Sequence, residues 1–401
     1  ATSTYSSGNV FSADHEKIAL EAAEKSMVLL KNDKNTLPIP GSVKKIAVLG
    51  LTVDYYQATT NSPGINNKAD DVNGGTINFA TGVRVGDVGS SRVNFDKARA
   101  VGPYDGIKAA AGSATVVWGS KASDASDADF IVVVVGLTPY DEGEEYNNSG
   151  DRNNLLLDGK DNGRGNAGTQ EKLIKEAAAL GKPMVVIMEG GSVIDISAWE
   201  NSVPAIVMAW YPGMLGGTAM GELLFGKKNF SGKLPITWPK SASDLPPFSG
   251  GTTTTMDYYV GYRYFDKENK TPRFPFGYGL SYTKFEYSNL VLPCSDATQS
   301  AVVKVSVDVA NTGSVDGDEV VLLFVSYPDT KARRPIKELK GFARVSVPAG
   351  SKKTVQIPLR VSDLKYWNST DKKWVVETGT VKVQVGPSSA DLPLSATFTV
   401  K

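Results

Sequence analysis

Continuous apolar runs recur through the first half of the chain, separated by segments that carry helical spacing or turn residues. The runs lie at 45–50, 114–118, 130–136, 183–188 and 205–210. Runs that are apolar at almost every position and are bounded by glycine or proline are typical of strands buried on both faces of a parallel sheet. Helical spacing follows Ser12, an expected N-cap, and places Ile18 and Ala22 on one apolar face. Strands that alternate with helices predict an α/β domain with a mainly parallel sheet.

The last third of the chain has a period of two instead. Val303, Val305 and Val307 alternate with polar residues, and the same alternation recurs at 381–385. Half-buried antiparallel strands produce this pattern. With turn signals such as 348–350, the region predicts an all-β sandwich of roughly seven strands.

Between these two regions, proline, glycine, threonine and aromatic residues dominate and the periodicity fades. We therefore divide the chain into an N-terminal arm (1–20), an α/β domain (21–245), a linker (246–282) and a β-sandwich (283–401). The aromatic run at 258–266 has two readings. Exposed rings stack on sugar faces, but a linker clamped against the domains is the preferred interpretation.

An acidic loop follows the central run 130–136, and it is the first candidate for chemistry. Glu142, Glu144 and Glu145 crowd into four positions. Ligands collect at the carboxyl ends of parallel strands, and repulsion between neighbouring carboxylates raises the proton affinity of one of them, as a general acid requires. The alternative reading is a solvated acidic loop with no catalytic role.

A series of motifs in a fixed order adds a family resemblance. They are AAEKSMVLLKN at 22–32, GDVGSS at 86–91, EGEEY at 142–146, GDRNNL at 150–155, SGKLP at 231–235 and FPFGYGLSY at 274–282. The series resembles glycoside hydrolase family 3 over nearly the whole chain. In that family a GEGY segment followed by GDRxxL forms the acid/base loop, an α/β sandwich carries that loop, and a fibronectin type III-like, immunoglobulin-type sandwich closes many members.

The resemblance implies roles for individual residues. Glu144 matches the proton-donating glutamate, but Glu145 replaces the glycine that should follow it, so Glu142 and Glu145 remain alternatives. The residues that match the loops around the sugar cleft are Asp87, Tyr146, Asp151 and Arg152. For Asp87, a turn held by its own side chains is an equal alternative. The implied substrate is a β-linked oligosaccharide or glycoside, with β-glucosides favoured by the DRNNL form of the loop.

The family's (α/β)8 barrel, which carries the aspartate nucleophile, has no match in this sequence. We expect the barrel to be a lost segment, a second chain or another protomer, and we expect this chain alone to be inactive because the covalent step needs that nucleophile. The alternative is a non-catalytic extracellular protein that uses the same scaffold for carbohydrate binding or assembly.

Composition argues against several other classes of protein. Lys plus Arg equals Asp plus Glu at 43 each, which gives no field to attract nucleic acid or an anionic membrane. A single cysteine, Cys294, and a single histidine, His15, argue against a disulfide framework, a histidine triad and a zinc cluster. The GDVGSS segment lacks both the dinucleotide fingerprint and the Walker lysine, so a nucleotide-binding reading ranks last. We expect no cofactor and no metal, and by resemblance an extracellular or periplasmic location.

Four further charged residues have mainly structural interpretations. Glu189 and Asp195 follow a predicted strand and are catalytic candidates by position alone, but the glycines after Glu189 indicate a turn and Asp195 a local anchor. Arg333 and Arg334 have the right chemistry to clamp a carboxylate, and we expect a solvated surface pair instead.

Overall fold

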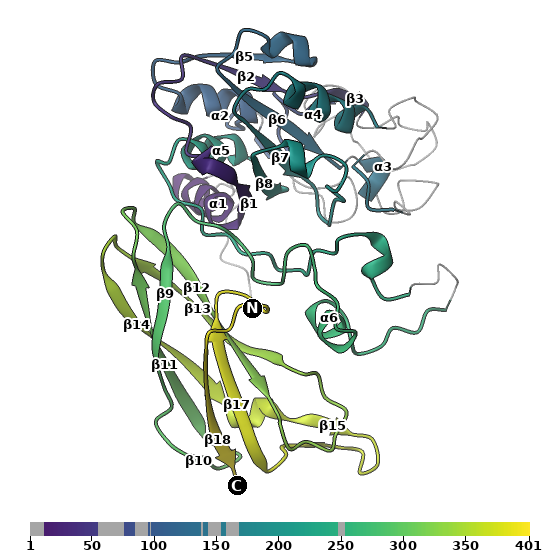
Figure 1. The fold of residues 1–401 in the computed structure, drawn as a ribbon, viewed down its shortest axis with the longest axis vertical. Coiled ribbons are helices and arrows are strands. Elements are labelled where there is room, and N and C mark those ends of the chain that lie inside the picture. The colour runs from purple at the N-terminus through teal and green to yellow at the C-terminus, as the bar shows by residue number, and fades with distance from the viewer. Residues whose placement is uncertain are drawn as a thin grey trace, which may run out of the picture. The chain divides into compact units, whose positions relative to one another are not determined.

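A computed structural model describes residues 12–54, 76–84, 95–96, 98–137, 139–142, 154–157, 168–247 and 253–401. The chain divides into two compact units, Ala1–Gly232 and Lys233–Lys401 (Figure 1). The residues predicted as a linker, 246–282, therefore fall in the second unit together with the β-sandwich. Each unit is described by itself below.

The first unit is built on a six-stranded sheet whose order is β1-β8-β7-β6-β2-β5. Its strands are β1 (Val28–Asn32), β2 (Lys45–Leu49), β5 (Thr115–Gly119), β6 (Phe130–Gly136), β7 (Met184–Glu189) and β8 (Ala205–Trp210). The pairings among β2, β5, β6, β7 and β8 are parallel, as the apolar runs predict. Sequence analysis did not predict β1, which pairs antiparallel with the edge of β8. A separate ribbon joins β3 (Thr52–Asp54) to β4 (Thr76–Asn78).

Helices cover both faces of this sheet. They are α1 (Ala13–Ser26), α2 (Pro103–Ala110), α4 (Thr169–Ala179) and α5 (Gly216–Leu224), with the short α3 (Pro139–Glu142) and the 3-10 turns η2 (Asp33–Asn35), η3 (Ala122–Ala125) and η5 (Glu200–Ser202). The crossover through α2 joins β2 to β5 at one edge of the sheet. The crossovers through η3, from β5 to β6, and through α4, from β6 to β7, run across the sheet in the opposite direction. Right-handed crossovers therefore put α2 on one face and η3 with α4 on the other.

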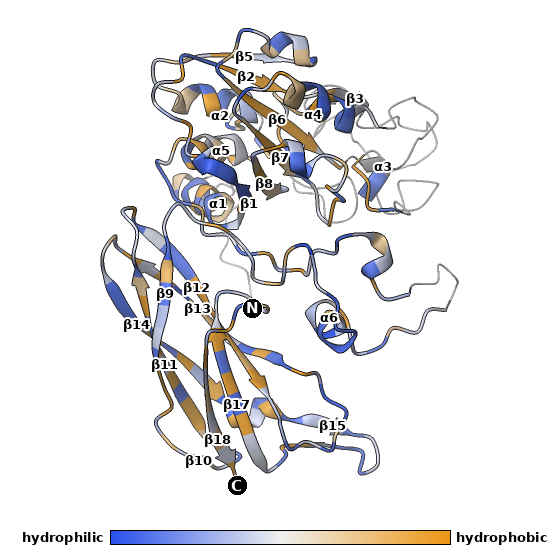
Figure 2. Cartoon of the chain, in the orientation of Figure 1, coloured by the Kyte–Doolittle hydropathy of each residue, from blue (hydrophilic) through white to orange (hydrophobic). Residues whose placement is uncertain are grey.

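The core of the first unit lies along the central strands. Every residue of β6 and β7 is buried, because the helical layers exclude water from both faces (Figure 2). The prediction for α1 is partly wrong. Ser12 does cap the helix, accepting a hydrogen bond from His15 N, but Ile18 is 63% exposed and Ala22 is also exposed. Only Ala23 and Glu24, in the last turns, are buried, so the apolar face is shorter than its spacing suggests.

The second unit carries the β-sandwich. Within 283–401, all of which the structure describes, β10-β18-β17-β12-β13 form one sheet and β14-β11-β9 the other. The strands are β9 (Phe285–Val291), β10 (Asp296–Ala297), β11 (Val302–Asn311), β12 (Gly317–Ser326), β13 (Glu338–Val347), β14 (Lys352–Arg360), β17 (Gly379–Gly386) and β18 (Leu394–Val400), and a small hairpin joins β15 (Tyr366–Asn368) to β16 (Lys373–Val375). The alternating valines face one shared core, which confirms the predicted sandwich.

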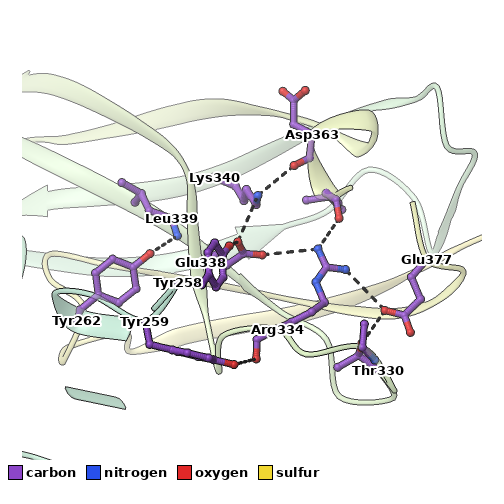
Figure 3. Close-up of polar contacts among 12 residues, drawn as sticks. Tyr258, Tyr259, Tyr262, Thr330, Arg334, Glu338, Leu339, Lys340, Asp363 and Glu377 are labelled. Atoms are coloured by element: carbon purple, nitrogen blue, oxygen red, sulfur yellow. Dashed lines mark hydrogen bonds and ion pairs between the residues drawn. The ribbon is translucent and has the colours of Figure 1, made fainter. Parts of the chain in front are cut away.

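The residues before the sandwich are fixed to it by polar contacts. This segment contains η6 (Ala242–Asp244) and α6 (Tyr262–Lys267), and the sandwich also contains η7 (Val361–Leu364). Tyr258 OH donates to Glu338 Oε1 at 2.9 Å, and Tyr262 OH accepts from Leu339 N at 2.9 Å (Figure 3). The aromatic run is therefore docked on the start of β13.

The expectation for Arg334 is wrong. Its side chain is 2% exposed, and the guanidinium lies 3.6 Å from both Glu338 and Glu377 while Nη2 donates to Leu364 O (Figure 3). Its Cζ stacks 3.3 Å from the centre of the Tyr327 ring. Arg333 alone keeps the predicted surface character, at 67% exposure with Nη2 on Asp257 at 2.6 Å. One of these two consecutive arginines is therefore buried and the other is exposed to solvent. The pattern of charges in the sequence does not indicate which one is buried.

Among the described residues no helix has the length and apolar character needed to cross a membrane.

Candidate active site

The carboxyl ends of the neighbouring strands β2 and β6 are the first part of the candidate site. From β2 the chain leads outward to β5 and then returns to β6 on the other side of β2, so this is the topological switch point of the sheet. The segment 76–84 crosses these ends. Gly136, the last residue of β6, allows that approach, because a Cβ there would lie 2.8 Å from Phe79 Cε1 and 2.4 Å from Glu189 O.

Glu142 is held in place by hydrogen bonds to residues that follow two other strands. It ends α3, and both of its carboxylate oxygens accept hydrogen bonds. Oε2 receives Gly191 N at 2.8 Å and Tyr211 OH at 2.6 Å, and Oε1 receives Ser192 Oγ. The donors follow β7 and β8, so Glu142 ties the first residues of the acidic loop to two neighbouring strand ends.

Arg84 lies under the same group of residues. The residue is 1% exposed, and its Nη2 donates to Leu137 O at 2.5 Å. Its guanidinium carbon lies 5.4 Å from the Phe79 ring centre and 5.3 Å from that of Tyr211, which are cation–π distances. Arg84 therefore packs against the Tyr211 ring, and the Tyr211 hydroxyl in turn binds Glu142.

Glu189, the last residue of β7, is a buried carboxyl group. It has no exposed surface, and neither carboxyl oxygen has a hydrogen-bond partner among the described residues. Burial raises the pKa of Glu189 to about 8, and the Arg84 charge opposes that shift only in part. At neutral pH the group is mainly protonated. Because it is sealed from solvent, a structural role fits it better than the catalytic role that its position suggests.

Asp195 is the local anchor that the sequence predicts. Its Oδ1 accepts from Ser197 N at 2.9 Å, and its backbone N donates to Leu155 O at 2.6 Å. The second of these bonds fixes the residues just after the acidic loop. The loop is thus held at both ends, through Glu142 before it and Leu155 after it.

Of the predicted site residues, the structure describes Glu142. Glu144, Glu145, Tyr146, Asp151, Arg152 and Asp87 lie outside the described residues. Sequence analysis assigned no role to Ser192, Tyr211 or Arg84. The available signal was an arginine two residues before GDVGSS, in a stretch otherwise short of charge.

Among the described residues, no group of three or more His, Cys, Asp or Glu side chains is placed to hold a metal ion. Both carboxylate oxygens of Glu142 are occupied as hydrogen-bond acceptors.

Comparisons with known proteins agree with this architecture. The model of the glycosyl hydrolase family 3 C-terminal domain matches residues 27–282, and that of the fibronectin type III-like domain matches 319–389. The first match covers more than half of the chain. The chain therefore belongs to glycoside hydrolase family 3, as the motif series indicates, and it combines the family's C-terminal α/β domain with a fibronectin type III-like domain.

Relatives of known name are glycosidases. The chain is 34% identical over 395 residues to thermostable β-glucosidase B of Acetivibrio thermocellus, covering 96% of this chain and 48% of that protein. It is 32% identical over 396 residues to the periplasmic β-glucosidase of Salmonella typhimurium, covering 95% and 50%. The structure of the β-D-glucoside glucohydrolase from Trichoderma reesei matches with a TM-score of 0.81 at 30% identity, covering 100% of this chain and 58% of that one. The chain thus spans about half the length of these relatives.

Proposed function

We propose that this chain is the C-terminal part of a retaining β-glycosidase of the β-glucosidase type, that it supplies the general acid/base, and that Glu144 is that residue. The supporting observation is the anchoring of Glu142. A general acid must present a proton to the departing oxygen of the substrate, and the Glu142 oxygens already accept three hydrogen bonds from the protein. We therefore assign Glu142 the anchoring role and Glu144, two residues further on, the catalytic one.

The second carboxylate of the reaction comes from outside this sequence in our proposal. A retaining glycosidase needs a nucleophile about 5–5.5 Å from the acid, and it forms a covalent glycosyl-enzyme that water then hydrolyses. The motif series holds no nucleophile segment, and the relatives extend over about twice the length of the match. A barrel domain or chain with an aspartate nucleophile supplies the missing half, and the substrate is a terminal β-glucoside.

The test is hydrolysis of aryl and alkyl β-glucosides by this chain alone and after co-expression with a family 3 barrel half. We expect activity only in the second case. Glu144→Gln should lower the rate on an alkyl glucoside by about 10²–10⁴-fold, and much less on a dinitrophenyl glucoside, whose leaving group departs without protonation.

Glu145→Gln is the matched control, because it removes a neighbouring carboxylate and should leave that dependence on the leaving group unchanged. Glu142→Gln should slow both substrates alike, since it loosens the loop. If Glu145→Gln shows the leaving-group dependence instead, the assignment of Glu144 is wrong. If a folded mixture hydrolyses nothing, the non-catalytic carbohydrate-binding alternative replaces the enzyme proposal.

We also propose a location outside the cytoplasm. One relative carries the word periplasmic in its name, and the proposed glycoside substrates suit that side of the membrane. Cell fractionation of the source organism with an antibody against this chain tests the location, and a signal confined to the cytoplasmic fraction contradicts it.

A further inference from the structure

The second unit contains a cavity that the proposed chemistry does not use. It has a volume of about 480 Å³, and all its lining residues lie between Thr237 and Leu392. The α6 segment forms one side, from Tyr262 to Pro275, and the end of β17 with the turn after it forms the other. Cavities of a few hundred Å³ with convergent polar groups are the usual form of small-molecule sites.

Three polar side chains that line this space have hydrogen-bonding capacity to spare. Gln384 Oε1 accepts from Ser326 Oγ at 2.9 Å, while Gln384 Nε2 has no hydrogen-bond partner among the described residues. Ser389 is 6% exposed, and its hydroxyl likewise has none within the described part of the chain. Thr237 is 8% exposed, and its Oγ1 is also unsatisfied by those residues. A hydroxylated ligand would satisfy the buried Thr237 hydroxyl, and it would replace the water that meets the Gln384 amide and the Ser389 hydroxyl.

The charged residues of the cavity already have partners within the protein. Lys337 Nζ lies 2.7 Å from both carboxylate oxygens of Asp266. Lys270 Nζ donates to the backbone oxygens of Ser243 and Asp244, at 3.4 and 3.1 Å. An anion such as phosphate would have to break one of these arrangements, so the lining favours a ligand without net charge.

The remaining wall is apolar. Tyr262, Pro275 and Leu392 contribute carbon surface, and Ile336, which is 61% exposed, adds to it. A ligand with both hydroxyl groups and an apolar C–H face matches this division. A purely apolar molecule does not, because it would leave Gln384 and Ser389 unpaired.

The cavity is held in shape by contacts outside it. The Tyr262 hydroxyl accepts from Leu339 N at 2.9 Å, and the Tyr262 ring centre lies 5.5 Å from those of Phe276 and Phe324 (Figure 3). The ion pair between Lys337 and Asp266 links the other side of α6 to the residue before β13. A site that is formed in advance loses less free energy on ordering when its ligand binds.

We propose that this cavity binds a neutral sugar, a mono- or disaccharide, at a site separate from the acidic loop. The proposal does not depend on the assignment of Glu144, because every lining residue lies in the second unit. The sugar hydroxyls pair with Gln384, Ser389 and the ion pair, and its C–H face lies on the wall formed by Pro275 and Ile336.

The experiment is ligand-detected NMR titration of the full chain with glucose and cellobiose, with inorganic phosphate and indole as comparison probes. Ala390→Trp fills the cavity from an exposed position and should abolish sugar binding. Gln299→Trp, at an exposed position outside the lining, is the control and should leave binding unchanged. Ser389→Ala should weaken binding by about 3–10-fold, the effect of one lost hydrogen bond.

A structural role for these groups predicts different results. Thr237→Val removes an unsatisfied hydroxyl while keeping the shape, so it should not lower the melting temperature, which makes any loss of sugar affinity attributable to the site. The proposal is overturned if folded Ala390→Trp binds sugar as well as the unchanged chain does. It is also overturned if Glu144→Gln alone abolishes binding, or if only phosphate or only indole binds.

Discussion

The hydroxyl of Tyr211, just after β8, donates to Glu142 Oε2 at 2.6 Å. This bond joins the end of the sheet to the residue at which the acidic loop begins, and the guanidinium carbon of Arg84 lies 5.3 Å from the centre of the same ring. The position of the proposed acid thus depends on a tyrosine that takes no part in proton transfer.

Tyr211→Phe should lower the free energy of unfolding of the first unit by about 1–3 kcal/mol, because it removes one of the two donors to Glu142 Oε2. Proteolysis within 143–153 should become faster for the same reason. Thermal melts and limited proteolysis measure the two effects. Tyr104→Phe is the control, since the Tyr104 hydroxyl only contacts Lys108 Nζ at 3.3 Å near the surface. Equal protease resistance in both variants would contradict the anchoring role.

Glu189 should make the first unit less stable as the pH rises from about 5 to 8. The pKa of Glu189 is about 8 in the folded state and 4.5 in the unfolded state. The folded state therefore binds more protons between these pH values, and its free energy of unfolding falls as the pH rises. The slope is roughly 1.4 kcal/mol per pH unit. Chemical denaturation at several pH values measures it, and Glu189→Gln should flatten the profile.

Glu176→Gln, at an exposed position of α4, is the matched control for Glu189 and should keep the slope of the unchanged chain. A Glu189→Gln profile as steep as that of the control would mean that the carboxyl is not held neutral by burial.

Arg334 and Arg333 offer a paired comparison in the second unit. Arg334→Ala should cost about 3–5 kcal/mol, because it removes a buried cation and leaves Glu338, which is 5% exposed, with Lys340 at 3.8 Å as its remaining cationic partner. Arg333→Ala should cost at most about 1 kcal/mol, since the ion pair that Arg333 forms with Asp257 is exposed to solvent. Calorimetry of the second unit's transition compares them, and similar losses in the two variants would show that the buried network contributes no more than the surface pair.

Asp308 should stabilise the β-sandwich above about pH 4. Hydrogen bonds from Thr354, Asn289 and Lys352 lower its pKa from 3.8 to about 2. The folded state therefore binds fewer protons than the unfolded state between these values, and the stabilisation is lost as the pH falls from 4 to 2. Asp308→Asn should melt lower than the unchanged chain at pH 7, with the gap closing toward pH 2. A gap that persists at pH 2 would contradict this account.

The sequence predicts the elements of this fold better than their environment. Continuous apolar runs identify the parallel strands because burial on both faces leaves no polar position, and the valine alternation identifies the sandwich for the corresponding reason. The strand β1 is missed because Lys31 and Asn32 interrupt its apolar run at the sheet edge.

The site residues are harder to predict because their roles depend on contacts between distant segments. Glu142 meets Gly191 and Tyr211, residues that follow two other strands, and no local pattern encodes those meetings. Arg333 and Arg334 show the same limit, since identical neighbouring side chains differ only in which face of the chain the sandwich covers.

The antiparallel strand β1 also sets the order of events during synthesis. Val28 pairs with Met208, so a strand at the start of the first unit completes the sheet only after nearly the whole unit has been made. A pairing between strands so far apart in the sequence forms late and slowly, because the long segment between them must first lose conformational entropy. Until that pairing forms, the apolar residues of β1 are exposed to solvent and can be bound by a chaperone.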